Sequence, residues 1–351
     1  FVREASYWTP YEGDLTAVRC RLCPHHCIVP ERERGLCGVR ECRDGRLVTL
    51  VYGRACKAVV VPIEERNLWN FLPGERTLTV AAAGCNLSCR GCNEWQFSQS
   101  SPDFQGTISA DPGSILQVAR TSECDVLAFG ITEPVVAWEW LKDCLIEARG
   151  AGMKTVLSTN GYLAGDALSE LIPHLSAVKV DLKGFNDDYY QTYCMGRLEP
   201  VLETILALKK GGVWLEIAWP VVPGGNDKED EAVAAAKWIL DKLGRDVPLH
   251  FLRHDPAYRL KHVPETSRRS LTLLRKLCMR EGLHHVYVHG VDDHEGRKTY
   301  CPSCLLPVVL RSANRIESGI DKGRCGACHS PIAGVWKAPT IQLGTGSESV
   351  V

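Results

Sequence analysis

The chain has 351 residues, of which 45% are hydrophobic and 24% are charged, and its formal net charge is −1 at pH 7. This composition is typical of a globular protein, and the near-neutral charge gives no electrostatic support for binding to nucleic acid or to an anionic membrane surface. No apolar run approaches the length of a membrane span and no signal peptide is evident, so we expect no membrane association and a cytoplasmic location.

Cysteine is unusually frequent in this chain. There are 17 cysteines, and most of them fall in short groups with the spacing of metal ligands. In a chain of this length, an odd number of grouped cysteines favours metal binding in a reducing compartment over a disulfide framework. The isolated cysteines are expected to be buried apolar residues; they are Cys124, Cys144, Cys194 and Cys278.

Residues 1–75 are expected to form a cysteine-rich metal-binding module with short strands. Four cysteines fall within 18 residues, and glycine and proline beside them allow tight turns. Zinc bound by four thiolates is the first choice for this site, and an auxiliary iron–sulfur cluster is the second. The candidate ligands are Cys20, Cys23, Cys27 and Cys37, with His25, His26 and Cys42 as further candidates.

Residues 76–296 alternate short β-like runs with helical segments, which predicts a parallel sheet with helices outside it. The predicted fold is an α/β, partial to nearly complete TIM-like (βα)6–8 barrel, with functional side chains at the C-terminal ends of its strands. Strands are expected at 77–83, 125–130, 154–158, 177–181, 214–222, 248–253 and 284–289, and helices near 112–122, 134–150, 165–174, 199–210, 228–243 and 265–282.

Three cysteines, Cys85, Cys89 and Cys92, directly follow the first of these strands. Three thiolates on a [4Fe–4S] cluster leave one iron open, whereas a structural zinc site would need a fourth ligand from elsewhere. The CxxxCxxC spacing resembles that of the radical S-adenosylmethionine (radical SAM) superfamily. The resemblance implies that the open iron chelates SAM and that reductive cleavage gives a 5′-deoxyadenosyl radical. Gly91 stands where the superfamily usually has an aromatic residue, and Trp95 and Phe97 are the nearest aromatic alternatives.

Polar residues follow the ends of the predicted barrel strands, where a bound SAM would need partners. We expect Glu133 near the SAM ammonium, Lys183 near its carboxylate, and Ser158, Asn160 or Asp181 near the carboxylate or the ribose. Asp255 and His294 are candidates for substrate contact, as is His254. The expected cofactor-binding residues are Gly130, Thr132, Glu133, Ser158, Asn160, Asp181, Lys183 and His254.

Residues 297–340 contain two CxxC pairs with twenty residues between them, which is a zinc-ribbon or rubredoxin-like pattern. Zinc is preferred over a lone iron ion for this site, and it would fold a module that is too small to fold on an apolar core alone. Its role is either structural or the docking of a protein or peptide substrate over the barrel. Residues 341–351 are expected to be a disordered tail. The candidate zinc ligands are Cys301, Cys304, Cys325 and Cys328.

Several motifs resemble the pyruvate formate-lyase activating enzymes and, more closely, the AmmeMemoRadiSam-system radical SAM proteins. The resemblance covers roughly residues 15–336. It implies a [4Fe–4S] cluster, SAM, an electron donor such as flavodoxin or ferredoxin, and Memo-like and AMMECR-like proteins as partners. The motifs include Thr132-Glu-Pro134, Ser158-Thr-Asn-Gly161, Val180-Asp-Leu-Lys-Gly184, Val222-Pro-Gly-Gly-Asn-Asp227 and, outside the barrel, Arg19–Cys27 and Thr299–Pro302.

The expected function is therefore that of an oxygen-sensitive radical SAM enzyme that abstracts hydrogen from a substrate, with a protein or peptide as the candidate substrate class. A dedicated activase for a glycyl-radical enzyme is the alternative within enzymes. A non-catalytic iron–sulfur and zinc scaffold, which would bind metal without turning over SAM, is the alternative from a different class.

Overall fold

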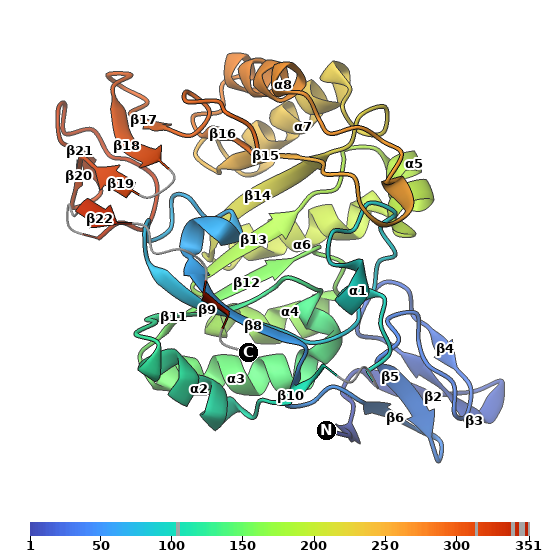
Figure 1. Ribbon diagram of the computed structural model, residues 1–351. Coiled ribbons are helices and arrows are strands. Elements are labelled where there is room, and N and C mark those ends of the chain that lie inside the picture. Colours follow the sequence, from blue (N-terminus) through green and yellow to red (C-terminus); the bar gives the residue numbers. More distant parts are fainter. Residues whose placement is uncertain (103–105, 313–314, 338–340, 344–347, 350–351) are drawn as a thin grey trace.

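The computed structural model describes residues 1–102, 106–312, 315–337, 341–343 and 348–349 (Figure 1). Its centre is one curved sheet in which seven neighbouring strands pair in parallel. An eighth strand pairs antiparallel with the seventh, and a ninth pairs antiparallel with the eighth. The seven parallel strands are those predicted from the sequence. In spatial order the strands are β16 (Val286–His289), β15 (Leu249–Arg253), β14 (Trp214–Val221), β13 (Ala177–Asp181), β12 (Lys154–Thr159), β11 (Val126–Phe129), β9 (Arg76–Ala81), β8 (Lys57–Pro62) and β23 (Glu348–Ser349).

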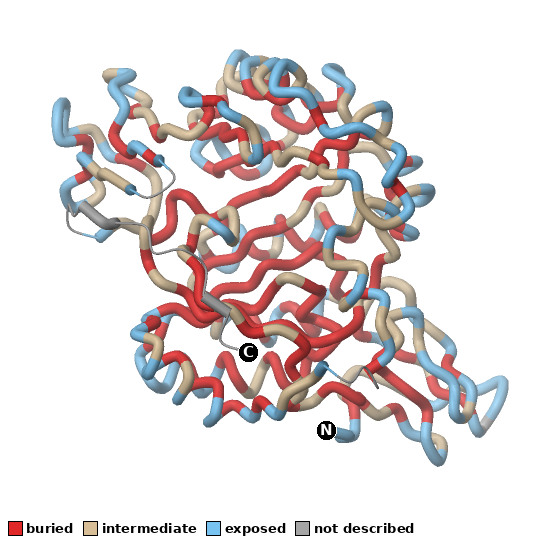
Figure 2. The backbone as a smooth tube through the Cα atoms, viewed as in Figure 1, coloured by how far each residue is buried: buried red, intermediate tan, exposed pale blue. Residues whose placement is uncertain are grey.

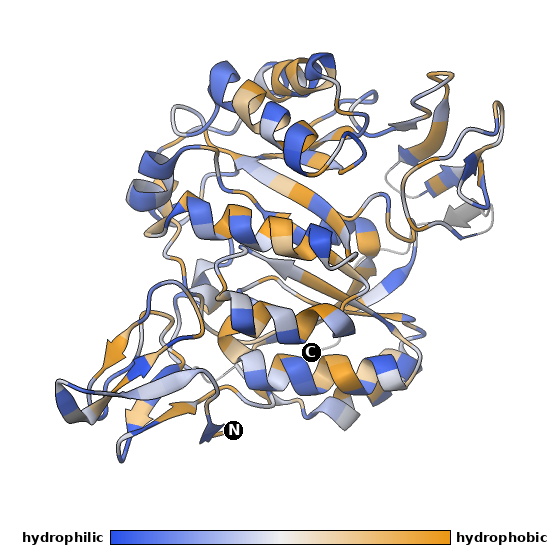
Figure 3. Cartoon of the chain, turned by 180° about the vertical axis from the view of Figure 1, so that it is seen from behind, coloured by the Kyte–Doolittle hydropathy of each residue, from blue (hydrophilic) through white to orange (hydrophobic). Residues whose placement is uncertain are grey.

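Helices cover the outer face of this sheet, as Figure 3 shows from behind. Their apolar stripes pack on the strands; in the helix that begins at Glu229, an acidic first turn precedes buried Ala232, Ala235 and Ile239. The predicted helices are confirmed, with two of them extended by 3₁₀ turns. They are α2 (Pro112–Thr121), η2 (Pro134–Ala137), α3 (Trp138–Gly150), α4 (Gly165–Leu171), η3 (Ile172–His174), α6 (Leu198–Lys210), α7 (Glu229–Lys242) and α8 (Arg268–Glu281).

The barrel is incomplete, as predicted, because β16 and β8 do not pair within the described part of the chain. The segment that follows β8, including η1 (Ile63–Arg66), instead enters the interior. There Ile63, Leu68 and Phe71 form a buried cluster with residues of β11, β12 and β13. This segment fills one end of the barrel and leaves the C-terminal ends of the strands for polar side chains.

The N-terminal residues form small antiparallel sheets beside the barrel. A buried ion pair joins them to α3, with Arg40 Nη2 2.9 Å from Glu139 Oε1. A boundary near residue 75 remains a prediction. The strands are β1 (Arg3–Glu4), β6 (Arg46–Thr49) and β5 (Arg40–Arg43) in one sheet, β2 (Trp8–Tyr11), β3 (Asp14–Cys20) and β4 (Ile28–Val29) in a second, and β7 (Arg54–Ala55) with β10 (Ile108–Ser109) in a third.

The C-terminal residues form two further small sheets at the opening between β16 and β8. The backbone of Val335 bonds to Asn70 and Leu72 in the segment that fills the barrel. The strands are β17 (Thr299–Tyr300), β18 (Pro307–Ser312), β19 (Arg315–Ser318) and β22 (Ile341–Leu343) in one sheet, and β20 (Ile320–Asp321) with β21 (Arg324–Cys325) in the other.

The expected disordered tail differs from the structure at two places. Residues Ile341–Leu343 pair with β19 as β22, and Glu348–Ser349 pair with β8 as β23, because both neighbours present a free strand edge. The remaining tail residues lie outside the described part. Figure 2 shows that burial concentrates in the central sheet, while both cysteine-rich ends carry most of their residues near the surface. No helix among the described residues is long and apolar enough to cross a lipid bilayer.

Candidate functional site

The loop after β9 carries Cys85, Cys89 and Cys92, and all three line one cavity of about 500 Å³ at the C-terminal ends of the strands. Two backbone hydrogen bonds attach this loop to the segment at Tyr193 and Cys194. Ser88 N donates to Cys194 O at 3.0 Å, and Arg90 N donates to Tyr193 O at 2.8 Å. The structure thus brings the three predicted cluster ligands to one cavity.

Cys194 lies at this cavity too, which the sequence did not indicate. It ends a π-helical turn, η4 (Tyr190–Cys194), that follows the short helix α5 (Asp187–Tyr189). The residue is buried, as expected for an isolated cysteine, but a hydrogen bond with its thiol lowers the pKa of Cys89. Single π-helical turns within helices are frequent at functional sites, but nothing in the local sequence marks this one.

Asp181 lies between two lysines at the end of β13. Its carboxylate pairs with Lys179 and, at 2.9 Å, with Lys183. Burial would raise the pKa of Asp181, but the two ammonium groups outweigh it and lower the pKa to about 2. All three side chains line the cavity, so this is a largely buried charge cluster and not a surface ion pair.

Glu133 is buried at the cavity wall and connects two strand ends. Its carboxylate accepts from Thr159 Oγ1 and from Asn160 N, each at 2.7 Å. Burial raises its pKa to about 7, although those hydrogen bonds oppose the shift. Thr132 beside it donates its hydroxyl to Ala82 O at 2.6 Å, which ties this turn to the loop that leads to the cysteines.

Asn160 and Ser158 are both predicted to contact SAM, but they differ in whether their side-chain hydrogen-bonding groups already have partners. Asn160 Nδ2 donates to Asn86 Oδ1 at 2.8 Å and lies 3.7 Å from Cys85 Sγ, while its Oδ1 accepts from Tyr162 N at 2.8 Å. Its side chain therefore holds the cysteine loop. Ser158 lines the cavity with a buried hydroxyl that has no partner among the described residues, so it is available to a ligand.

Gly130 makes room for that hydroxyl-bearing side chain. A Cβ at Gly130 would lie 2.8 Å from Cβ of Ser158. The predicted glycine therefore serves the packing of the turn, and its neighbours Ile131, Thr132 and Glu133 line the cavity.

His254 occupies the space beside Gly91, the position at which this chain lacks the usual aromatic residue. A Cβ at Gly91 would lie 3.4 Å from His254 Cε1 and 3.0 Å from Leu260 Cδ1. His254 is buried and lines the cavity, and its Nε2 has no partner among the described residues. An aromatic ring thus reaches the cavity from the loop after β15 instead of from the cysteine loop.

The remaining candidates lie outside the cavity lining. Trp95, in α1 (Trp95–Ser98), stacks on Tyr258 of η5 (Tyr258–Leu260) with ring centroids 5.2 Å apart. Asp255 pairs with Arg253 at 2.7 Å. His294 is 82% exposed and faces Asp292.

The four N-terminal thiols surround a second, much smaller cavity. Cys20, Cys23, Cys27 and Cys37 line it together with Arg40, two of whose buried guanidinium nitrogens have no described partner. Asn86, next to Cys85, closes the cavity toward the barrel, and His25 Nε2 donates to Asn86 O at 2.7 Å. Cys42 instead donates its thiol to Thr16 O, and His26 does not line this cavity.

The four C-terminal thiols are much closer together. Cys301 and Cys328 have sulfurs 3.5 Å apart, Cys304 and Cys325 have sulfurs 3.7 Å apart, and all four lie within 4.8 Å of one another. Across the described ranges, no other group of three or more candidate ligands is gathered this tightly. Tetrahedral zinc with bonds of about 2.3 Å requires sulfurs about 3.8 Å apart, so this group fits a zinc ion.

Comparisons with known proteins show which family the chain is similar to. Residues 79–236 match the family model of the radical SAM superfamily. The uncharacterized protein MJ0808 of Methanocaldococcus jannaschii is 38% identical, over 94% of this chain and 99% of that protein. The isethionate sulfite-lyase activating enzyme of Desulfovibrio desulfuricans is 32% identical, over 48% of this chain and 74% of that enzyme. The pyruvate formate-lyase 1-activating enzyme of Escherichia coli K12 is 29% identical, over 48% of this chain and 70% of that enzyme.

Proposed function

The chain belongs to the radical SAM superfamily, and from that membership we propose that Cys85, Cys89 and Cys92 hold the [4Fe–4S] cluster at which it cleaves SAM. The observation that carries the proposal is the convergence of these three thiols on one cavity that also contains a buried charge cluster and an unpartnered hydroxyl. Three thiolates fit a cluster with one open iron. When bound, the cluster supplies the electron that breaks the S–C5′ bond of SAM.

The chain's own residues orient and enclose the cofactor. Lys183 presents an ammonium for the SAM carboxylate, and Asp181 fixes that ammonium in place. Ser158 Oγ offers a hydrogen bond that no described residue uses, and the His254 ring packs beside Gly91 where the adenine would need an apolar wall. Glu133 and Asn160 support the site indirectly, because their polar atoms hold the strand ends and the cysteine loop.

The metal assignments at the two ends of the chain differ. The tight C-terminal thiols support zinc. Among the described residues, neither the four N-terminal thiols nor Cys85, Cys89 and Cys92 form a group as tight as the C-terminal one. This wider spacing supports an auxiliary iron–sulfur cluster there, the second choice from sequence, because a four-iron cluster separates its thiolates more than a single ion does.

Substrate and partners follow from the resemblance and stay at the level of proposal. Similarity to activating enzymes supports a protein or peptide substrate and, as the alternative, a glycyl-radical activase. Membership of the AmmeMemoRadiSam group would add Memo-like and AMMECR-like partners, and flavodoxin or ferredoxin would be the electron donor.

The test is anaerobic. We expect the reconstituted protein to convert SAM to 5′-deoxyadenosine and methionine with dithionite, and Cys89→Ala to produce neither. Absence of product from wild-type protein that holds a complete cluster would overturn the proposal and favour the non-catalytic scaffold.

A further inference from the structure

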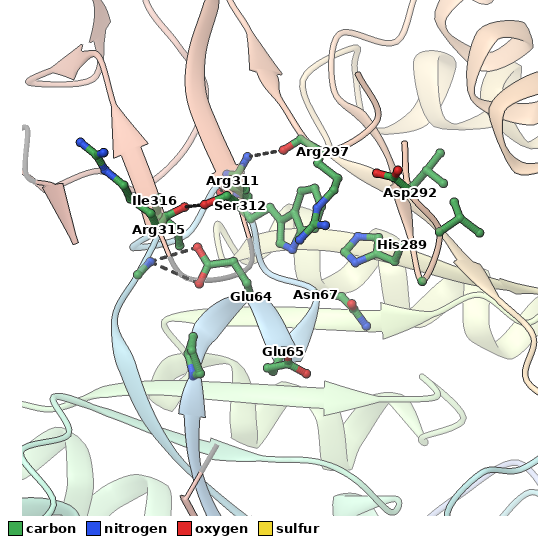
Figure 4. Close-up of a pocket in the computed structure, with 16 residues that line it drawn as sticks. Glu64, Glu65, Asn67, His289, Asp292, Arg297, Arg311, Ser312, Arg315 and Ile316 are labelled. Carbon is green, nitrogen blue, oxygen red and sulfur yellow. Dashed lines mark hydrogen bonds between the residues drawn. The ribbon is translucent and has the colours of Figure 1, made fainter. Parts of the chain in front are cut away.

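Another cavity, of about 630 Å³, lies at the opening between β16 and β8 (Figure 4). We call it the seam cavity. It is lined by the segment after β8, by the end of β16 and by the C-terminal module. Figure 4 shows Arg297 and His289 on one side and Glu64, Glu65 and Asn67 on the other. Glu65 and Asn67 also line the cysteine cavity, so the two cavities are neighbours.

Behind the seam cavity lies a buried carboxylate with four donors. Glu216 accepts from the backbone N–H groups of Trp69 and Asn70 and from Trp214 Nε1, each at 2.9 Å. His250 Nε2 is 2.7 Å from the same carboxylate. The three N–H groups can only donate, so the carboxylate of Glu216 accepts from each of them, and we assign the ring proton of His250 to Nε2, which donates to the same carboxylate.

The proton on Nε2 of His250 also fixes the tautomer of His289. Burial lowers the pKa of both His250 and His289, so both rings are neutral. With its proton on Nε2, His250 has a lone pair on Nδ1, which lies 2.8 Å from His289 Nε2. The Nε2 of His289 therefore donates, and its Nδ1 keeps a lone pair. His289 lines the seam cavity, and the Trp69 ring fixes its orientation with centroids 4.1 Å apart.

Cationic groups lie in the same cavity. Arg311 is only 9% exposed; it donates to Thr299 Oγ1 at 2.9 Å, and its Nε has no partner in the described part of the chain. Arg297 lines the cavity without a carboxylate partner among the described ion pairs. Trp69, Val288 and Ile316 add apolar surface. The cavity thus combines a fixed acceptor, the guanidinium groups of Arg297 and Arg311 and an apolar wall, with the acidic Glu64, Glu65 and Asp292 also in its lining.

We propose that the seam cavity binds the carboxylate end of the substrate, with Arg297 on the carboxylate and Nδ1 of His289 accepting from an O–H or N–H on the adjacent carbon. This inference rests on the proposed radical function, because it names the chemistry of the molecule presented to the neighbouring SAM site. The matching chemistry is an α-hydroxy or α-amino acid, either free or as the C-terminal residue of a peptide. Glu216 and His250 are positioning residues that act through His289.

Anaerobic isothermal titration calorimetry on the cluster-loaded protein tests the proposal with four probes. These are 3-phenyllactate, N-acetylphenylalanine as a peptide end, 3-phenylpropionate, which lacks the donor, and methyl 3-phenyllactate, which lacks the charge. We expect saturable binding of one or both of the first two, and at least tenfold weaker binding of the last two. Whichever of the first two binds more tightly identifies the source. No saturable binding, or equal binding of 3-phenylpropionate, would overturn the proposal.

Substitutions distinguish residues that contact the probe from residues that only position His289. His289→Leu and Arg297→Gln should each weaken binding at least tenfold, and His250→Leu should do the same by releasing His289. His250→Gln keeps one donor for Glu216 and one acceptor for His289, so it should restore affinity to within about threefold of wild type. The exposed His262, outside the cavity, provides the control His262→Gln, which should change nothing. Unchanged affinity in His289→Leu would contradict the proposal.

The same preparations distinguish this proposal from the one on which it rests. Formation of 5′-deoxyadenosine from SAM and dithionite, without any probe, reports the radical chemistry alone. SAM cleavage without probe binding would remove only the seam-cavity proposal, whereas probe binding without SAM cleavage by a loaded cluster would remove only the proposed function.

Discussion

Asp181 is the residue on which the charge balance of the cysteine cavity depends. It is the shared partner of Lys179 and Lys183, and all three lie largely away from water. Removing one member of such a group leaves uncompensated buried charge, which costs far more than an exposed ion pair contributes.

We therefore expect Asp181→Asn to lower the free energy of unfolding by roughly 3 kcal/mol, because both ammonium groups lose their carboxylate. Urea denaturation of the cluster-loaded protein measures this. The matched control is Asp241→Asn, which breaks an exposed pair with Lys242 and should cost less than about 1 kcal/mol. Equal effects of the two substitutions would show that the Asp181 cluster is solvated.

Glu133 leads to a prediction about how folding stability depends on pH. The sign is opposite to that for an ion-paired carboxylate, whose pKa is lowered in the folded state. Its pKa is raised by burial from 4.5 to about 7 in the folded protein. Between these values the folded state holds a proton that the unfolded state has lost, so the stability from this group is lost as pH rises from about 4.5 to about 7. Glu133→Gln should remove that dependence, as thermal unfolding at pH 5.5, 6.5 and 7.5 would measure. Parallel pH profiles for both proteins would contradict the raised pKa.

Single residues also show where sequence reasoning stops. The three cysteines and Ser158 could be placed at the cavity because they follow strand ends in a parallel sheet. Cys194 could not, because a π-helical turn has no sequence signature of its own. The commitment of Asn160 to the cysteine loop depends on Asn86, 74 residues earlier, so only the fold reveals it.

The loop after β9 passes close to the N-terminal module. Gly84 adopts φ +96°, and a Cβ there would lie 2.8 Å from Cys37 O and 2.6 Å from Val39 Cγ1. The glycine was visible in the sequence as the end of a strand, but the close approach of Cys37 was not. Asp227 lies one residue before Lys228, the N-cap of α7, and its side chain accepts from Gly224 N at 2.9 Å.

Gly84→Ala should therefore be strongly destabilising, by about 2–4 kcal/mol, because strain and a backbone clash coincide. It should also reduce iron occupancy, since the loop to Cys85 must shift. Gly150→Ala near the end of α3 is the control: nothing lies within 4 Å of its added Cβ, and a neutral or slightly stabilising effect is expected. Unfolding curves and iron analysis of both variants test this, and similar behaviour of the two would contradict it.

At the scale of the whole molecule, alternation of strands and helices was sufficient to predict the seven parallel strands and their helices. It did not predict that β8 would extend the sheet or that the segment around Phe71 would fill the barrel. These features depend on contacts between residues hundreds of positions apart, such as Asn70 Nδ2 to Ala333 O at 3.0 Å. Local periodicity carries no information about such pairings.

The metal content should reflect three separate thiol groups. We expect about eight iron atoms and about one zinc per chain by elemental analysis. Cys304→Ser should remove the zinc and leave the iron, whereas Cys23→Ser should remove about half of the iron and leave the zinc. Two zinc and four iron atoms in the wild type would show that the N-terminal site holds zinc instead of an iron–sulfur cluster.

The link between Asn70 and the chain around Val335 also sets an order of events during synthesis. Asn70, Phe71 and Leu72 emerge from the ribosome early, but their partners Ala333 and Val335 are translated more than 260 residues later. Until then, the side of the barrel between β16 and β8 is not covered by the C-terminal module. The segment that fills the barrel therefore lacks these backbone partners while the intervening chain is being synthesised.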